Sequence, residues 1–320
     1  MSQEDTLHTL AIGAQVDRYT IERQIGGGGF SIVYLAKDLE ADTLVVIKEY
    51  MPRKLATRGE DGLTVTATED DEKSADRFAQ GKKLFFQEAA TLATLKHPNI
   101  VNVTSFFRAN GTVYMVMEYE SGINLQDYIK RHHGGLSEKL IRTVFPPLLD
   151  GLKLIHSRGL LHLDIKPGNI YLRSGGKPLL LDFGAVHEMM QSRQDQVSQV
   201  VTPGFSPIEQ LKPGGYVGPW SDIYAIGATM RACIEGAAPP PSGQRALEDT
   251  MRPAAVLFRK RYSQALLRAI DWATEVDPLA RPQNVEQLLE AMNREEPEEP
   301  PAPESMLERL ANSLPWGKGG

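Results

Sequence analysis

The sequence predicts an α+β chain in two parts, a small strand-rich part followed by a larger, mainly helical part. Segments with β-branched and aromatic residues bounded by turn signals cluster in roughly the first 120 residues, whereas helical periodicity dominates the rest. Strands that precede a run of helices are typical of α+β chains. The 320 residues and the 41% hydrophobic content fit a globular protein with one large domain or two lobes, plus a tail.

The first part is expected to contain five strands and one helix. The strands are predicted over 19–25, 32–37, 43–49, 100–109 and 112–119, and the last two are joined at Asn110-Gly111, a strong hairpin signal. The helix is predicted over 84–95, between the third and fourth strands. Residues 53–80 contain the acidic run from Glu69 to Glu72 and are expected to form a surface excursion with solvated charges.

The second part is expected to consist mainly of helices, over 125–132, 137–157, 219–235, 263–274 and 285–294. The composition changes near Asn293, and the segment 293–303 that begins there is dominated by Glu and Pro. Such a stretch cannot bury enough apolar surface to offset its ordering entropy, so it is predicted to be a solvated linker. The tail 304–320 has Met306, Leu307 and Leu310 at helical spacing, and is predicted to be either a docking helix or a frayed end.

Charge and cysteine content exclude several classes. The net charge of −6 makes nucleic acid a weak candidate partner, because nucleic acid usually requires a basic face. The first 15 residues do not have the pattern of a signal peptide, and no stretch is apolar and uncharged for the roughly 18 residues that a membrane span needs. The single cysteine, Cys233, excludes an internal disulfide and fits a reducing compartment, so a cytoplasmic location is expected.

Two features near the N-terminus are compatible with a nucleotide site. Four glycines, 26–29, lie between two expected strands and would let backbone N–H groups approach phosphate oxygens, although a glycine-rich turn without a ligand is the alternative. Neither a P-loop nor a Rossmann turn fits, because no Gly-Lys-Ser/Thr follows and the next element is a strand. Lys48 lies in an apolar strand and could reach nucleotide phosphates if Glu88 held its ammonium group, but a surface lysine is again the alternative.

The segment 162–169 and the turn 182–184 supply the chemical groups that phosphoryl transfer requires. The first reads His-Leu-Asp-Ile-Lys-Pro-Gly-Asn and the second Asp-Phe-Gly. In that reaction Asp164 would orient a hydroxyl nucleophile, and Lys166 would offset charge on the transferred phosphoryl group. Asn169 and Asp182 would hold a divalent cation through oxygen atoms, the ligands that Mg²⁺ prefers.

Together these motifs resemble those of the eukaryotic-like protein kinase superfamily, in the same order along the chain. The segment 202–209 resembles the end of an activation segment, 220–227 the start of the central helix of the large lobe, and 277–282 a late loop whose arginine pairs with the glutamate of the activation segment. The resemblance therefore implies a pair between Arg281 and Glu209. The segments 47–52 and 206–210 are similar to those of bacterial serine/threonine kinases.

The resemblance implies a two-lobed protein kinase fold over residues 19–292, preceded by an N-terminal extension, 1–18. The N-lobe, about 19–118, would be a small antiparallel sheet with one helix, and the C-lobe, about 119–292, would be larger and mainly helical. It also implies ATP and Mg²⁺, with Mn²⁺ able to substitute. Ten residues would contact the nucleotide: Ile25, Gly26, Gly28, Val33, Val46, Lys48, Met117, Glu118, Tyr119 and Leu172.

The implied activity is phosphorylation of serine or threonine hydroxyls on proteins, including autophosphorylation, because Lys166 follows Asp164 by two residues as in that branch. Leu163 stands where many kinases have an arginine that grips a phosphorylated activation loop. Activity is therefore expected not to depend on phosphorylation of Ser192 or Ser198. Thr202 is expected to order the catalytic aspartate rather than to be a phosphorylation site.

Two other functions stay open at this point. A pseudokinase scaffold is supported only by Leu163 and by Ser31, which replaces the third loop glycine. A small-molecule kinase shares the catalytic motifs but usually lacks the segment 202–209, which favours a polypeptide substrate. Protein substrates are the expected partners, and both docking through the C-terminal tail and a homodimer remain open.

Overall fold

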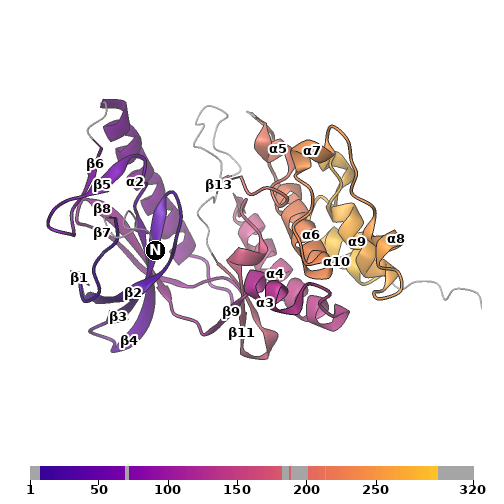
Figure 1. Cartoon of the computed structure of the whole chain (residues 1–320), viewed down its shortest axis with the longest axis horizontal. Coiled ribbons are helices and arrows are strands. Elements are labelled where there is room, and N and C mark those ends of the chain that lie inside the picture. The colour runs from indigo at the N-terminus through magenta and orange to yellow at the C-terminus, as the bar shows by residue number, and fades with distance from the viewer. Residues whose placement is uncertain (1–7, 69–71, 182–186, 189–200, 213, 295–320) are drawn as a thin grey trace, which may run out of the picture.

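The chain folds into two lobes that lie side by side. The computed structural model describes residues 8–68, 72–181, 187–188, 201–212 and 214–294. Figure 1 shows the strand-rich lobe, built from the indigo and purple N-terminal part, next to the helical lobe built from the magenta to yellow part. The predicted α+β, two-lobed architecture is therefore confirmed.

Within the part of the chain that the structure describes, the first lobe is built on an antiparallel sheet of six strands in the order β1-β2-β3-β4-β8-β7. The five predicted strands are present, and their ends differ from prediction by a few residues. Residues 100–101 do not join β7, because the backbone of Ile100 and Val101 pairs with Leu180 of the other lobe instead. The strands are β1 (Gln15–Val16), β2 (Tyr19–Gly27), β3 (Ser31–Asp38), β4 (Thr43–Tyr50), β7 (Val103–Ala109) and β8 (Thr112–Glu118).

One long helix, α2 (Glu72–Ala93), packs against β7 and β8. The predicted helix 84–95 is correct in place but begins too late. The first three turns are polar in sequence, so they give no clear apolar stripe. They are held instead by Phe78, whose ring stacks on Tyr50 of β4 with 5.8 Å between the ring centroids.

The surface excursion predicted for 53–80 is wrong for most of that segment. It forms a small hairpin, β5 (Ala56–Arg58) and β6 (Val65–Ala67), followed by the start of α2. Ala56 and Val65 are buried, and the backbone N–H of Val65 donates to Asn110 O in the β7–β8 turn. The hairpin is therefore part of the lobe rather than a solvated loop. Residues 69–71 of the acidic run lie outside the described residues.

In the described residues, the second lobe contains the five helices that the sequence predicts, with ends within two residues of prediction, and three further single-turn helices. Side-chain N-caps explain several of the starts, because Asn124, Ser137 and Ser263 each accept a hydrogen bond from a backbone N–H of the first turn. The helices are α3 (Leu125–His132), α4 (Glu138–Ser157), α5 (Ile208–Leu211), α6 (Pro219–Glu235), α7 (Ser242–Arg245), α8 (Ala254–Leu257), α9 (Gln264–Ala273) and α10 (Val285–Met292).

Helix α6 forms the centre of this lobe and packs against α4, α9 and α10. Its residues from Ser221 to Ile234 are all buried, as expected of a helix that is apolar on most of its surface. Cys233 lies among them with 1% of its surface exposed.

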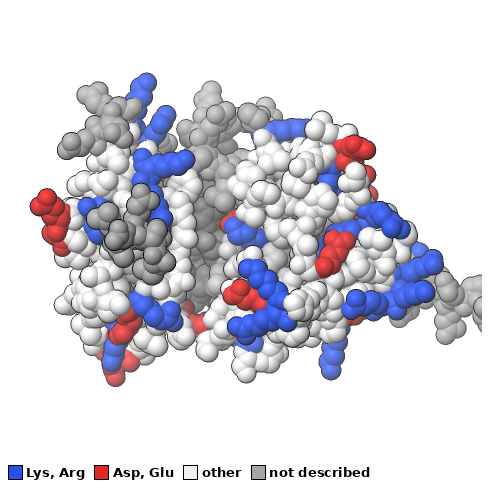
Figure 2. Space-filling view, in the orientation of Figure 1, with Lys and Arg blue, Asp and Glu red and all other residues white. Residues whose placement is uncertain are grey.

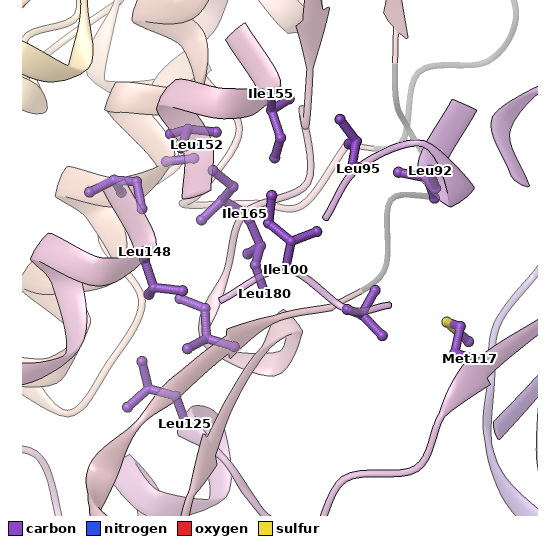
Figure 3. Packing of buried hydrophobic residues seen from close by; sticks show 14 of the residues in the cluster. Leu92, Leu95, Ile100, Met117, Leu125, Leu148, Leu152, Ile155, Ile165 and Leu180 are labelled. Carbon is purple, nitrogen blue, oxygen red and sulfur yellow. The ribbon is translucent and has the colours of Figure 1, made fainter. Parts of the chain in front are cut away.

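Short strands lie where the two lobes meet: β9 (Gly122–Asn124), β10 (Leu160–Leu161), β11 (Ile170–Arg173), β12 (Pro178–Leu180) and β13 (His187–Glu188). Buried apolar side chains continue across this junction. Figure 3 shows Ile100 beside Leu180 and Ile165, with Leu95 of the first lobe close by and the α4 residues Leu152 and Ile155 on the other side. Both lobes therefore share one apolar core at the level of the loop 162–169.

The surface carries charge unevenly. Figure 2 shows lysine and arginine side chains gathered on parts of both lobes, although the net charge of the chain is −6. Among the residues that the structure describes, no helix has the length and apolar character needed to cross a membrane.

Candidate active site

The loop 162–169 connects β10 to β11 at the junction of the lobes, and it has one strained residue. Leu163 has φ +57°, the left-handed region that a non-glycine residue rarely adopts. Its side chain is buried, with 3% exposed. A conformation of this kind costs about 1–2 kcal/mol and persists only where surrounding contacts hold it.

The carboxylate of Asp164 is held by three side chains. Lys166 Nζ lies 2.9 Å from Oδ1 and 2.8 Å from Oδ2, and Thr202 Oγ1 donates to Oδ1 at 2.9 Å. Lys166 also donates to Thr202 Oγ1 at 3.1 Å, so the ammonium, the hydroxyl and the carboxylate form a closed triangle. The third is Asn169, whose Nδ2 donates to Oδ2 at 2.9 Å. The predicted contact of Thr202 with this aspartate is therefore present.

Asn169 presents its amide nitrogen to Asp164 and so turns its oxygen away from it. Nδ2 donates both to the carboxylate and, at 2.8 Å, to the backbone carbonyl of Asp164. Oδ1 is thus the atom that a cation could use. Asp182, the second predicted ligand, lies outside the described residues, but its neighbour Leu181 is fixed at this loop. The Leu181 N–H donates to Asn169 O at 2.8 Å, and its carbonyl lies 3.2 Å from Nε2 of His162.

Asp222, at the start of α6, fixes the backbone of the loop 162–169. Its carboxylate accepts the backbone N–H groups of His162 and Leu163 at 2.9 and 2.8 Å and contacts His156 Nε2 at 2.8 Å. Burial by itself would raise the pKa of Asp222, but the hydrogen bond from His156 and the charges of His156 and His162 lower it below the ordinary value. The group therefore stays ionised and keeps accepting both N–H groups.

Lys48 lies on the inner face of the sheet, on β4. It pairs with Val33 of β3 and Met115 of β8, and its side chain is 5% exposed. Its ammonium lies 5.9 Å from the ring centroid of Phe85 on α2. Glu88 follows Phe85 by three residues and so lies on the same side of that helix.

The residues predicted to contact adenine come from both lobes. Val46 pairs directly with Met117 and is two residues from Lys48, so alternation places Val33, Val46, Lys48 and Met117 on one face of the sheet. Leu172 lies on β11 of the other lobe and is 5% exposed.

The connection between the lobes begins with Glu118 and Tyr119. The Glu118 N–H donates to Asn102 O at 3.1 Å, so of its two backbone groups the carbonyl is the one that it can offer to a base. The Tyr119 side chain is 40% exposed.

The glycine-rich turn connects β2 to β3 and leaves room above its backbone. A Cβ added at Gly28 would have no neighbouring atom within 4 Å, and one at Gly26 would meet only the Val33 side chain, at 3.7 Å. Ile25, at the end of the β2 segment before the turn, is 39% exposed. A backbone hydrogen bond fixes the end of the turn, because the N–H of Met51 donates to Phe30 O at 2.9 Å.

The pair that the resemblance implied between Arg281 and Glu209 is present. Arg281 donates to the two oxygens of Glu209 at 2.8 and 3.1 Å, and the side chains are 0% and 6% exposed. The segment that ends at Glu209 is thereby fixed to the loop before α10 in the helical lobe.

Comparison with known proteins agrees with this arrangement. The chain matches the protein kinase domain family over residues 19–310, past the end predicted at 292. The chain belongs to the protein kinase family. The serine/threonine-protein kinase D of Synechocystis sp. is 31% identical over 295 residues, which are 87% of this chain and 52% of that protein. The serine/threonine-protein kinase PknA of Nostoc sp. is 30% identical over 290 residues, 86% of this chain and 47% of that protein.

A solved structure of PpkA-294 in its apo form is also similar, with a TM-score of 0.78, 36% identity, and coverage of 89% of this chain and 100% of that chain. These findings confirm the predicted resemblance to bacterial serine/threonine kinases. The chain spans about half the length of the curated relatives that it matches.

Sequence reasoning missed two residues of this kinase site. Asp222 could have been found, because a carboxylate inside the apolar run of α6 requires a buried partner. Gln210 follows the Pro-x-Glu end of the activation segment, and its Nε2 donates to Leu163 O at 2.8 Å. No local pattern indicates that contact, because its two ends are 47 residues apart.

Proposed function

We propose that this kinase transfers the γ-phosphoryl group of ATP to serine or threonine hydroxyls of proteins. The single observation that best supports this is the fixed carboxylate of Asp164, which Lys166 and Thr202 hold in one orientation. A substrate hydroxyl must lose its proton as it attacks phosphorus, and a carboxylate held in place can orient that hydroxyl and accept the proton.

Lys166 and Lys48 provide positive charge on the proposed path of the phosphoryl group. Lys166 touches Asp164 and so lies where the nucleophile would attack, where it would offset charge on the transferred group. Lys48 would hold the nucleotide phosphates from the sheet side. We propose that Glu88 positions this ammonium, because it shares a side of α2 with Phe85, which Lys48 contacts.

The residues present fit a magnesium site that is completed by nucleotide phosphates. Asn169 directs Oδ1 away from Asp164, and Asp182 follows directly after Leu181, whose N–H is bonded to Asn169. Two protein oxygens are enough, since Mg²⁺ commonly takes one or two protein ligands plus phosphates and water. Among the described residues there is no group of three or more His, Cys, Asp or Glu that could form an all-protein site. Bound Mg²⁺, or Mn²⁺ in its place, would neutralise charge on the phosphates.

The proposed nucleotide site continues from the phosphates to the base. We propose that the glycine-rich turn, with Gly26 and Gly28, covers the phosphates. The adenine ring would lie between the sheet face that carries Val33 and Val46 and the Leu172 side chain below, with Ile25 at the rim. Glu118 and Tyr119 would offer it backbone groups beside Met117.

The decisive experiment replaces Asp164 with Asn, which keeps the shape of the side chain and removes its charge. Wild-type protein is expected to incorporate labelled phosphate from ATP into casein and into itself in the presence of Mg²⁺, and D164N to lose at least 100-fold in rate. Nucleotide binding by D164N, measured by its thermal shift, should persist. Equal labelling by the two proteins would refute the proposed function.

We further propose that activity does not require phosphorylation of the activation segment, because Leu163 has no charge with which to grip a phosphate. Ser192 and Ser198, which lie outside the described residues, are the available hydroxyls. The double variant with alanine at both positions should keep an initial rate within tenfold of wild type, and a larger loss would contradict this proposal.

Three finer proposals rest on the sequence: a cytoplasmic location, partner docking through the tail 304–320, and the option of a homodimer. The lone buried cysteine supports the first of these proposals, and the helical spacing of Met306, Leu307 and Leu310 supports the second. A tail-deleted variant that keeps activity toward casein but loses a protein partner would support the docking role. The tail lies outside the described residues.

A further inference from the structure

The peptide group between Leu163 and Asp164 is fixed at both of its ends. Its carbonyl accepts the hydrogen bond from Gln210 Nε2 at 2.8 Å, and its N–H, which belongs to Asp164, donates to Nδ1 of His162 at 3.3 Å. This peptide plane determines where the Asp164 side chain leaves the backbone. Its orientation therefore contributes to the direction of the carboxylate.

The hydrogen bond to His162 is longer than the bond from Gln210, so Gln210 makes the closer contact with this peptide group. Asp222 holds the preceding N–H groups, of His162 and Leu163, but it does not touch the Leu163 carbonyl. With φ of Leu163 at +57°, a rotation of the following peptide plane toward a more common conformation would move that carbonyl away from Gln210. The Gln210 bond opposes this rotation.

Gln210 is itself well anchored. Its side chain is 3% exposed, and its N–H donates to Pro207 O. The preceding residue, Glu209, is held by the buried pair with Arg281 and by Ser221 Oγ at 2.8 Å. Only the NH₂ end of the amide can donate to a carbonyl, so the direction of the bond is set by chemistry.

We propose that Gln210 is a positioning residue for phosphoryl transfer, which holds the Leu163–Asp164 peptide in the orientation that aims the Asp164 carboxylate at the substrate hydroxyl. This inference rests on the proposed function. It gives the end of the activation segment two separate contacts with the catalytic loop, Thr202 on the carboxylate and Gln210 on the backbone behind it.

The test compares two replacements that remove the donor and keep the length of the side chain, Gln210→Met and Gln210→Glu. Steady-state kinetics with ATP and casein should show kcat reduced by about 10- to 100-fold, because small displacements of a reacting group have effects of this size. KM for ATP should change by less than about twofold, since Gln210 lies behind the loop rather than at the nucleotide. The unfolding temperature, measured in parallel, should stay within a few degrees of wild type.

The matched control is Gln264→Met on α9. Gln264 Nε2 also donates to a backbone carbonyl, that of Ala255 at 3.2 Å, but far from the catalytic loop along the chain and on a different helix. This variant should keep wild-type kcat. If kcat falls equally in Gln210→Met and Gln264→Met, the loss is a general effect of removing an amide-to-carbonyl hydrogen bond, and the proposal is overturned.

The remaining outcomes also decide the matter. An active wild type with unchanged kcat in both Gln210 variants would overturn the positioning role and leave the proposed function intact. An inactive wild type that is indistinguishable from D164N would refute both. If both Gln210 variants lose the native fold, the residue maintains the fold rather than the catalytic loop, and the proposal is wrong.

Discussion

At the scale of single residues, the site depends on hydroxyl and amide groups that hold one carboxylate. Thr202 illustrates this, because its hydroxyl donates to Asp164 and accepts from Lys166 at the same time. A hydroxyl in that position keeps the two charged groups at a fixed separation, and no apolar side chain can replace both bonds.

We expect Thr202→Val to lower kcat by roughly tenfold or more. A hydrogen bond to a charged group contributes about 1.5–3 kcal/mol, and about 1.4 kcal/mol corresponds to a factor of ten in rate. Thr202→Ser keeps the hydroxyl and serves as the control, with kcat within about threefold of wild type. A loss in Thr202→Ser together with near wild-type kcat in Thr202→Val would show that the methyl group, not the hydroxyl, matters.

The sequence was sufficient for residues whose partners belong to the same short motif. Asp164, Lys166 and Asn169 lie within six positions, so their spacing alone predicts that they meet. The contact of Gln210 with Leu163 could not be predicted, because the left-handed backbone of Leu163 appears only when the whole loop is folded.

At the scale of elements, the hairpin β5–β6 is attached to the sheet through a buried ion pair. Arg58 donates to Glu49 Oε2 at 2.6 Å, and the two side chains are 2% and 0% exposed. Tyr34 and Tyr114 also donate to this carboxylate, at 3.0 and 2.9 Å. Burial, and then the neighbouring Glu49 charge, raises the pKa of both tyrosines, so they stay protonated and keep donating.

The same network holds residues 8–10, the first that the structure describes, against the sheet. Arg58 Nε donates to His8 O at 2.9 Å, and the Leu10 N–H donates to Tyr34 Oη at 3.0 Å. The position of Glu49 directly after Lys48 means that the network is next to the proposed phosphate contact on β4.

Arg58→Met should therefore destabilise the protein by roughly 3–5 kcal/mol, because it leaves a buried carboxylate without its cation. The free energy of unfolding from urea titration is the measurement. Arg18→Met is the matched control, since Arg18 pairs with Asp38 and Glu40 but is 41% exposed, and it should cost far less stability than Arg58→Met. Similar costs for the two variants would contradict the proposed importance of the buried pair.

Glu138, in the first turn of α4, connects this helix to α9. Its carboxylate accepts the N–H and the hydroxyl of Ser263 at 2.8 and 2.6 Å, and Arg142 Nε at 2.7 Å. Partial burial alone would raise the pKa of Glu138, but the hydrogen bonds from Ser263 and Arg142 lower it below its ordinary value.

A lowered folded-state pKa means that this carboxylate stabilises the fold above its unfolded pKa of about 4.3, and that the contribution is lost as the pH falls through the folded value. Glu138→Gln should thus lower the unfolding temperature at pH 7, and the difference from wild type should shrink below about pH 4. Glu248→Gln, at an exposed position after α7, is the control and should match wild type throughout. A difference that does not vary with pH would contradict this prediction.

Whether an element could be predicted from the sequence depended on where its stabilising contacts lie. Helices with their own side-chain N-caps and apolar stripes, such as α3 and α4, were predicted with ends correct to within one residue. The hairpin β5–β6 and the first turns of α2 were not, because Arg58 and Phe78 find their partners on β4, and periodicity within the segment does not reveal them.

At the scale of the whole molecule, the proposed nucleotide would lie between the lobes and contact both. Its binding should therefore stabilise the whole fold. At an ATP concentration of about 100 times Kd, with Mg²⁺, the gain is about 2.7 kcal/mol, which corresponds to a rise of roughly 5 °C in unfolding temperature.

The thermal shift should fall sharply when Mg²⁺ is removed with EDTA, and also in Lys48→Met, which removes the ammonium on β4. A scaffold that does not use nucleotide would show no shift under any of these conditions. That result would favour the pseudokinase alternative over the proposed enzyme.

The single sulfhydryl of the chain, in the interior of α6, has a practical consequence. Burial raises the pKa of Cys233 and removes it from solvent, so a thiol-reactive dye cannot label the native protein at this position. Labelling requires the helical lobe to open. The rate at which dye is incorporated under native conditions thus measures how often that lobe opens, without any engineered probe.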